Sequence, residues 1–288
     1  MNRFYTNEEL EDLVAKACIE KAFPVTVHFF QDLPTKVPQP LGCGVLFTFQ
    51  DNFFIITAAH LLEGNIYNDL RVMVEGYLYP LQGVWRFVHK DVDDTQEFPQ
   101  NIDLAVFKLI PCQLLTRLQQ DRGFLELQHL AFDQQQLIAS SPDVENALCG
   151  YQIVGYPGSR TKFDTTADTY RSTMYVTYTT LHKKNLKRLR EKFNSNHHLF
   201  FDYRTTGKDP REKNKVNLPT YEGLSGTGIW KVDHFVGGDL NIKLGGIFLQ
   251  TSQKDSIMIG LKIDLIIQVI REAFNLPRLP KIDLSVSA

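Results

Sequence analysis

The hydrophobic residues of the chain fall mainly into short β-like runs separated by turns. "PVTVHFF" alternates between apolar and polar positions, and "GCGVLFTFQ" and "NFFIITAAH" follow as two β-rich runs. The pair Asp51-Asn52 between the last two runs is a favourable two-residue hairpin turn. Short runs of this kind, bounded by Gly, Pro, Asn and Asp, predict antiparallel strands.

These runs form two clusters along the chain. The first cluster is completed by "LRVMVEGYLYPL", "GVWRFVHK" and "DLAVFKLI". Residues 113–131 then interrupt the strand pattern, because they mix glutamine, leucine and charged residues. We interpret this segment as a partly helical connector. The runs resume with "YQIVGYP", "STMYVTYTTL", "HHLFFDYR", "TGIWKVD", "LGGIFLQT" and "SIMIGLKI". Two clusters of short strands predict an all-β protein made of two barrels or sandwiches.

Helical periodicity is found at the two ends of the pattern. Residues 6–22 predict a helix that Pro24 stops, and residues 264–274 predict a second one with Asp264 as N-cap and Pro277 just beyond it. The predicted organisation is an N-terminal helix (1–24), a first β-barrel (25–112), a connector (113–144), a second β-barrel (145–263) and a C-terminal helix and tail (264–288).

The composition narrows the cellular context and the partners. With 288 residues the chain is long enough for two lobes with a sizeable core, and 31 basic against 33 acidic residues give no reason to expect nucleic acid or an anionic membrane as partner. The sequence shows neither a secretory signal nor a membrane span, so we expect a cytoplasmic protein. The widely separated cysteines predict buried thiols rather than disulfides or a zinc site: Cys18, Cys43, Cys112 and Cys149.

Chemistry is suggested first by "NLPTYEGLSGTGIW", where Ser225 lies between Gly223 and Gly226. A serine hydroxyl needs a base within hydrogen-bond reach and a group that orients this base. Among eight histidines, His60 ends the apolar run "FFIITAAH", and the strand end fixes the position of its ring. Asp103 in "NIDLAVFKL" precedes a strongly apolar strand, where a carboxylate must find a partner.

The order His60, Asp103, Ser225 excludes one common class of serine hydrolase. The α/β-hydrolases place serine first and histidine last, with the serine in a GxSxG motif. Thr227 stands where the last glycine of that motif would be, and the only histidine after the serine is His234, nine residues on.

"TAAH", "DLAVFKL" and "GLSGTGIW", in this order, resemble the trypsin-like (chymotrypsin-fold) serine peptidases. The chain is most similar to the bacterial trypsin-like peptidase domains, whose serine loop reads G-x-S-G. "GCGVLF" resembles their G-S-G strand with Cys43 in the place of the serine, "VGYPGSR" resembles their G-Y-P strand, and "LGGIFLQ" resembles the strand that lines the substrate cleft. The similarity spans approximately residues 25–275.

This resemblance implies two six-stranded antiparallel β-barrels with a catalytic triad between them. It implies that Ser225 attacks the scissile carbonyl, that His60 transfers the proton and that Asp103 holds the imidazole tautomer. The main-chain N–H groups of Gly223 and Ser225 would form the oxyanion hole, and Gly226 would leave room for substrate. No cofactor is expected. No metal is expected either, because the pair His197-His198 has no third ligand at suitable spacing.

By the same resemblance, the primary substrate pocket is lined by residues just before the serine and on the two following strands: Pro219, Thr220, Leu249, Thr251 and Gly260. None of them is charged. A basic substrate side chain would lack a partner there, so we expect a neutral, small or apolar residue at this position of the substrate.

Two features bear on regulation. Leu224 occupies the position where activatable relatives carry an aspartate that pairs with a newly cut N-terminus, so control is expected from a partner, a loop rearrangement or an inhibitory insertion. The run 183–192, "KKNLKRLREK", predicts an amphipathic helix with a basic face. That face is either simply solvated or a docking element for an acidic partner.

The sequence therefore predicts a cytoplasmic, bacterial, trypsin-like serine endopeptidase that acts on protein or peptide substrates. One alternative is a catalytically inactive protease-fold module that binds protein partners. Another is a peptidase held latent in a multi-protein sensor, for instance of an antiviral or stress system.

Overall fold

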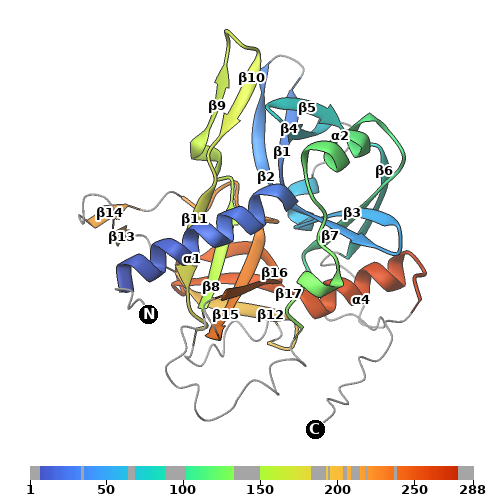
Figure 1. The fold of residues 1–288 in the computed structure, drawn as a ribbon. Helices are drawn as coiled ribbons and strands as arrows, with labels where there is room; N and C mark the ends of the chain where they lie inside the picture. Colours follow the sequence, from blue (N-terminus) through green and yellow to red (C-terminus); the bar gives the residue numbers. More distant parts are fainter. Residues whose placement is uncertain are drawn as a thin grey trace.

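The computed structural model describes residues 7–33, 36–63, 69–88, 102–132, 150–182, 193, 195–203, 206–208, 215–217, 220–236 and 239–277. These residues form two curled antiparallel sheets with few helices (Figure 1). The all-β architecture predicted from the sequence is confirmed. The basic run 183–192 and Pro219 lie outside the described residues, as do Cys149 and the tail beyond Pro277.

The first sheet has seven strands in the order β5-β4-β1-β2-β3-β7-β6. Their bounds are β1 (Thr26–Leu33), β2 (Lys36–Phe49), β3 (Asn52–Thr57), β4 (Leu70–Val74), β5 (Tyr77–Pro80), β6 (Gly83–Val88) and β7 (Leu104–Leu109). Most strands pair with a neighbour in sequence, which suits short turns.

The turn between β2 and β3 lies one residue earlier than the sequence predicts. Phe49 pairs with Asn52, and the two turn residues are Gln50 and Asp51, both with positive φ (49° and 59°). Asn52 instead begins β3, and its side-chain Nδ2 donates to the carbonyls of Gln50 (2.7 Å) and Phe49 (3.3 Å). The amide of Asn52 therefore stabilises the turn from outside it.

The second sheet has six strands in the order β11-β8-β15-β16-β17-β12. Their bounds are β8 (Gly150–Gly155), β11 (Tyr175–Thr179), β12 (His198–Asp202), β15 (Gly228–Val236), β16 (Asp239–Ser252) and β17 (Ile257–Lys262). Main-chain bonds from His182 N to Phe200 O (2.8 Å) and from Asp202 N to Thr180 O (3.3 Å) join the residues after β11 to β12. The two edges of this sheet are thus connected, as in a barrel.

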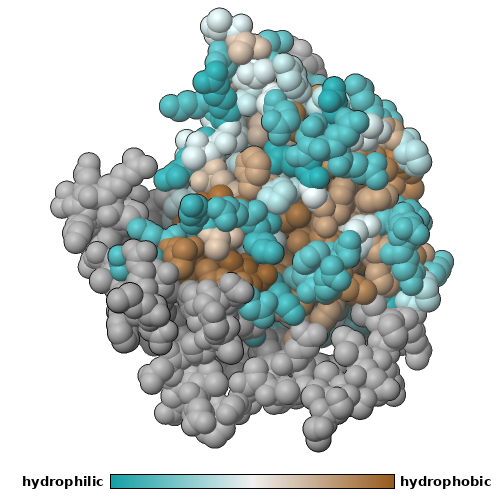
Figure 2. Space-filling model, viewed as in Figure 1, coloured by the Kyte–Doolittle hydropathy of each residue, from teal (hydrophilic) through white to brown (hydrophobic). Residues whose placement is uncertain are grey.

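Two further pairs of strands lie outside these sheets: β9 (Thr161–Asp164) with β10 (Thr169–Ser172), and β13 (Thr206–Lys208) with β14 (Lys215–Asn217). The hairpin β9–β10 projects at the top of Figure 1, and hydrophilic and intermediate colours dominate it in Figure 2. Its inner side packs on the first sheet, since the Tyr170 ring lies 4.6 Å from that of Phe30 and its hydroxyl donates to Pro38 O. The polar sequence of this hairpin did not predict strands.

The predicted helices at the two ends are present as α1 (Asn7–Ala22) and α4 (Ile263–Ala273), and α2 (Gln113–Asp121) lies in the predicted connector. Helix α1 contacts β8, β11 and β16 of the second sheet. Four short 3₁₀ turns complete the described elements: η1 (Phe23–Val25), η2 (Ala59–Leu62), η4 (Leu127–His129) and η7 (Gly158–Arg160). No described helix is both long enough and apolar enough to cross a bilayer.

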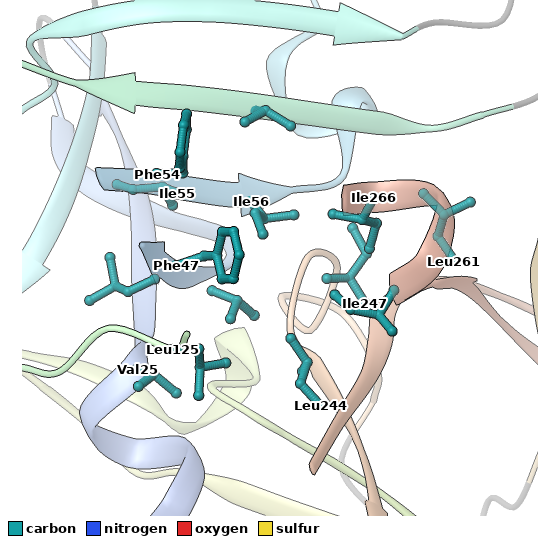
Figure 3. Packing of buried hydrophobic residues seen from close by; sticks show 14 of the residues in the cluster. Val25, Phe47, Phe54, Ile55, Ile56, Leu125, Leu244, Ile247, Leu261 and Ile266 are labelled. Carbon is teal, nitrogen blue, oxygen red and sulfur yellow. The ribbon is translucent and has the colours of Figure 1, made fainter. Parts of the chain in front are cut away.

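One hydrophobic core extends across both sheets. Figure 3 shows Phe47 and Ile56 of the first sheet facing Ile247 of the second sheet and Ile266 of α4, and all four are fully buried. This continuous packing fixes the two sheets relative to each other. A site that takes residues from both sheets can therefore keep its geometry.

Candidate active site

Strand pairing brings His60 and Asp103 together. His60 follows β3 and lies in η2, while Asp103 immediately precedes β7. Strands β3 and β7 are antiparallel neighbours with Thr57 opposite Ala105, so the end of β3 meets the beginning of β7. Residues 43 positions apart in sequence thus become neighbours in space.

The Asp103 carboxylate binds both the ring and the main chain of His60. His60 Nδ1 lies 2.5 Å from Asp103 Oδ2, and the His60 main-chain N–H donates to Oδ1 at 2.8 Å. Both side chains are partly buried, with 33% of His60 and 22% of Asp103 exposed. The two contacts together fix the position and the orientation of the imidazole.

Burial and charge act in opposite directions on this pair. Burial alone would lower the pKa of His60, but the hydrogen bond to Asp103 and the charges of Asp103 and Glu63 raise it above the ordinary value. Burial alone would raise the pKa of Asp103, but His60 and the main-chain N–H groups of His60 and Ala59 lower it below the ordinary value. Asp103 is therefore ionised and accepts a hydrogen bond from the Nδ1–H of His60. This leaves Nε2 of neutral His60 as the basic nitrogen.

The serine loop, residues 220–227, lies against the strands of the first sheet that lead to His60. Cys43 of β2 donates its main-chain N–H to Ser225 O at 2.8 Å. A Cβ added at Gly42 would lie 2.5 Å from the Leu61 side chain and 2.9 Å from Ser225 O. Gly42 therefore allows the residue after His60 and the serine to approach the same point of β2.

The Ser225 hydroxyl donates to the main-chain carbonyl of Leu249 at 2.9 Å. Leu249 lies at an irregularity of β16, between Phe248 and Gln250, which both pair with β17. Within the described residues, no hydrogen bond joins this hydroxyl to the His60 ring. Catalytic hydrogen bonds are commonly long in ligand-free sites and form when substrate is bound.

The peptide groups around Gly223, one of the two expected oxyanion donors, are held in a defined arrangement. Glu222 O accepts from Gly158 N at 3.0 Å, and because the C=O and N–H of one trans peptide point in opposite directions, the Gly223 N–H points away from Gly158. In the described part of the chain, no hydrogen bond uses the N–H of Gly223 or of Ser225. Gly223 has φ of +84°, and a Cβ there would lie 2.5 Å from Gly158 N.

Gly226 has a different role from the one expected. Its φ is +81°, and an added Cβ would collide with Cys43 O and with the Thr57 hydroxyl. The space that this glycine leaves free is occupied by β2 and β3 rather than kept open for substrate. Its N–H donates to Phe248 O at 2.7 Å, which ties the loop to the second sheet.

Leu224 lies fully buried in the apolar interior of the second sheet. It belongs to a cluster of buried side chains: Tyr151, Ile153, Tyr175, Leu199, Phe201, Tyr221, Ile229, Phe248 and Met258. Its N–H donates to Tyr221 O at 3.1 Å. Apolar packing therefore anchors the serine loop at Leu224.

The residues expected in a primary pocket are distributed over three segments. Thr220 is exposed, Thr251 is half-buried opposite Met258, and Leu249 is fully buried. Gly260 on β17 pairs with Phe248. A Cβ added at Gly260 would collide with the Ile229 side chain and Ile247 O. The composition of the pocket stays a prediction.

The contacts that sequence reasoning missed are mostly made by the main chain. Gly158 N, which holds Glu222, and Leu249 O, which accepts from Ser225, carry no side-chain signature. The only available sign was the resemblance of "VGYPGSR" to a strand of the second barrel, and it did not indicate a contact with the serine loop.

A serine hydroxyl, an oriented imidazole, an ionised carboxylate and two unused N–H groups are the components of acyl transfer. No protein-family model matches the sequence. No curated protein matches it significantly either. Among solved structures, the scabies mite inactivated protease paralogue S-D1 is similar, with 14% identity and a TM-score of 0.50 over 90% of this chain and 95% of that chain. The chain therefore has the chymotrypsin-like double-barrel fold.

Proposed function

We propose that the chain is a serine endopeptidase of the bacterial trypsin-like type, with His60, Asp103 and Ser225 as its triad. The observation that carries this proposal is the contact of 2.5 Å between His60 Nδ1 and Asp103 Oδ2, together with the N–H groups of Gly223 and Ser225, which make no hydrogen bond to any described residue. A purely structural histidine would not require two free donors beside a serine.

In the proposed reaction, Ser225 first leaves the Leu249 carbonyl and turns to His60. His60 Nε2 takes the hydroxyl proton while Oγ attacks the scissile carbonyl carbon, and the negative oxygen is bound by the two N–H groups. Protonated His60 then gives the proton to the leaving amine. A water molecule, activated by the same nitrogen, hydrolyses the acyl-enzyme.

The finer properties of the enzyme belong to the same proposal. A neutral, small or apolar substrate residue fits the uncharged Thr220, Leu249 and Thr251. The buried Leu224 supports control by a partner rather than by a cut N-terminus. We place the enzyme in the bacterial cytoplasm; a defence or stress system belongs to the alternative of a latent peptidase in a multi-protein sensor.

One observation favours the second candidate, an inactive protease-fold module that binds protein partners. The Ser225 hydroxyl donates to Leu249 O, and in this rotamer it cannot also donate to His60. The similar mite protein is described as an inactivated paralogue, which is a statement about that protein.

A fluorophosphonate probe tests the choice between the two. The Ser225 oxygen forms a bond to phosphorus, fluoride leaves, and the hydroxyl proton passes to His60. We expect wild type and Ser252→Ala to be labelled, and Ser225→Ala and His60→Ala to remain unlabelled. Ser252 is the matched control because its hydroxyl binds Asp255 in the turn between β16 and β17.

Equal labelling of wild type and Ser225→Ala contradicts the proposal. So does an absence of labelling both alone and after addition of a bacterial lysate. Labelling only after the lysate is added would identify a latent enzyme. The inactive module predicts no labelling in any condition.

A further inference from the structure

Cys43 lies at the contact between the first sheet and the serine loop, and all its polar groups are engaged there. It is fully buried in β2. Its N–H donates to Ser225 O at 2.8 Å, and its carbonyl accepts from the Thr57 hydroxyl at 2.6 Å. The main chain of Cys43 thus holds the serine from the side of the first sheet.

The thiol of Cys43 contacts two segments next to the second sheet, the residue after β8 and the serine loop. Tyr156 N donates to Sγ at 3.3 Å, and Sγ lies 3.3 Å from Gly223 O and 3.8 Å from Tyr156 O. A thiol has a single hydrogen, and the shorter contact directs it to Gly223 O. Burial raises the pKa of this thiol to about 12, so it keeps the hydrogen that the bond requires.

Both peptide groups that flank Gly223 are therefore held from outside the serine loop. The carbonyl before Gly223 is bound by Gly158 N, and the carbonyl of Gly223 itself is bound by the Cys43 thiol. The peptide between Gly223 and Leu224 is also restrained by the Leu224 N–H, which donates to Tyr221 O at 3.1 Å, but a glycine at φ of +84° has no Cβ to limit backbone rotation on either side of it. The Gly223 N–H belongs to the peptide that Gly158 N holds, so releasing the Gly223 carbonyl would act on this N–H indirectly, by letting the backbone rotate about the Gly223 Cα.

We propose that Cys43 is a positioning residue whose thiol fixes the direction of the Gly223 N–H in the oxyanion hole. This inference rests on the proposed peptidase function. The thiol acts through Gly223 and is neither a nucleophile nor a redox group, because it is fully buried and stays protonated.

Three variants separate positioning from simple packing. Cys43→Ser keeps a donor for Gly223 O and an acceptor for Tyr156 N, whereas Cys43→Ala keeps neither. Cys18→Ala is the matched control, because Cys18 is equally buried but lies in α1, in the hydrophobic core. Cys18→Ala makes the same change of volume without touching the serine loop.

The test measures the inactivation constant kinact and the binding constant KI of a fluorophosphonate probe. We expect Cys43→Ala to lower kinact about tenfold, below the 10²–10³-fold of a lost oxyanion donor, with KI unchanged. Cys43→Ser should remain within about threefold of wild type, and Cys18→Ala should match it. Amide hydrogen exchange of residues 221–227 should rise in Cys43→Ala only.

Wild-type kinact in Cys43→Ala, or equal losses in Cys43→Ala and Cys43→Ser, would overturn the inference while the peptidase proposal stands. An unreactive wild type overturns the peptidase proposal and the catalytic role of Cys43 together. In that case the exchange measurement still decides whether the thiol orders the loop. Equal exchange in all four proteins would refute this as well.

Discussion

The two halves of the candidate site are held by different forces. On the first sheet, His60 is fixed by a short contact to an ionised carboxylate, and both groups titrate. On the second sheet, the loop of Ser225 is fixed by main-chain hydrogen bonds, a neutral thiol and a buried Leu224. The half on the first sheet should therefore respond strongly to pH and to loss of charge. The half on the second sheet should respond to substitutions that disturb its steric fit, and we call it the shape-dependent half.

The largest expected effect is on the charged half. Asp103→Asn replaces the acceptor of the Nδ1 proton by an amide and favours the wrong imidazole tautomer. We expect kinact for the fluorophosphonate probe to fall about 10⁴-fold with little change in stability. The control is Asp202→Asn, since Asp202 makes a similar contact of 2.6 Å with His182 Nδ1, at the junction of β11 and β12. If both variants lose the same activity, Asp103 has no special role.

The shape-dependent half is tested by Gly226→Ala. The new methyl group would collide with Cys43 O and the Thr57 hydroxyl, at a φ of +81°. We expect a loss of about 3 kcal/mol in the free energy of unfolding, measured by urea denaturation. Gly245→Ala is the control, because a Cβ there meets its nearest neighbours at 3.6 Å. Similar losses in both variants would show that any added methyl in these strands is costly.

His28, in β1 of the first sheet, is a point where the contact with the shape-dependent half should become sensitive to acid. It is fully buried opposite Cys43, its ring stacks on Tyr156 at 5.4 Å, and burial lowers its pKa to about 3. In the unfolded chain His28 binds a proton near pH 6.5, whereas in the folded chain it stays neutral at this pH. Stability should therefore fall as pH drops below 6.5, by about 1.4 kcal/mol per pH unit at most.

Comparing His28→Gln with wild type at pH 7 and pH 4.5 isolates this contribution. We expect the variant to lose about 2.5 kcal/mol less than wild type over this interval, measured by urea denaturation. An equal loss in both proteins would assign the acid sensitivity to other groups.

The smallest expected effect is a shift in the pH dependence of the rate. The pKa of His60 is raised above 6.5, so the protonated and inactive form should persist to a higher pH than for an ordinary histidine. The rate of labelling should fall about tenfold per pH unit below this pKa. Glu63→Gln should lower the apparent pKa, because the charge of Glu63 contributes to raising it. Cys43→Ser, on the other half, should leave it unchanged.

The sequence predicted the fold class and the terminal helices because these depend on hydrophobic periodicity, which a single chain displays. It also indicated His60 and Asp103, since a histidine at the end of a strand and an aspartate before an apolar strand are visible in one dimension. The turn at Gln50-Asp51 and the role of Gly226 could not be predicted in this way. Both depend on which main-chain atoms of other strands come close, and main-chain atoms are the same at every position.

The continuous core beneath both sheets has a consequence for how the molecule could be divided. Phe47, Ile56, Ile247 and Ile266 contribute to one interior that both sheets share, in addition to the smaller cluster around Leu224 in the second sheet. Fragments such as 1–132 and 150–288 would each expose an apolar face and should remain largely unfolded alone, yet recombine into a native-like complex. The chain should behave as one cooperative unit in calorimetry, with a single unfolding transition despite its two-lobed outline.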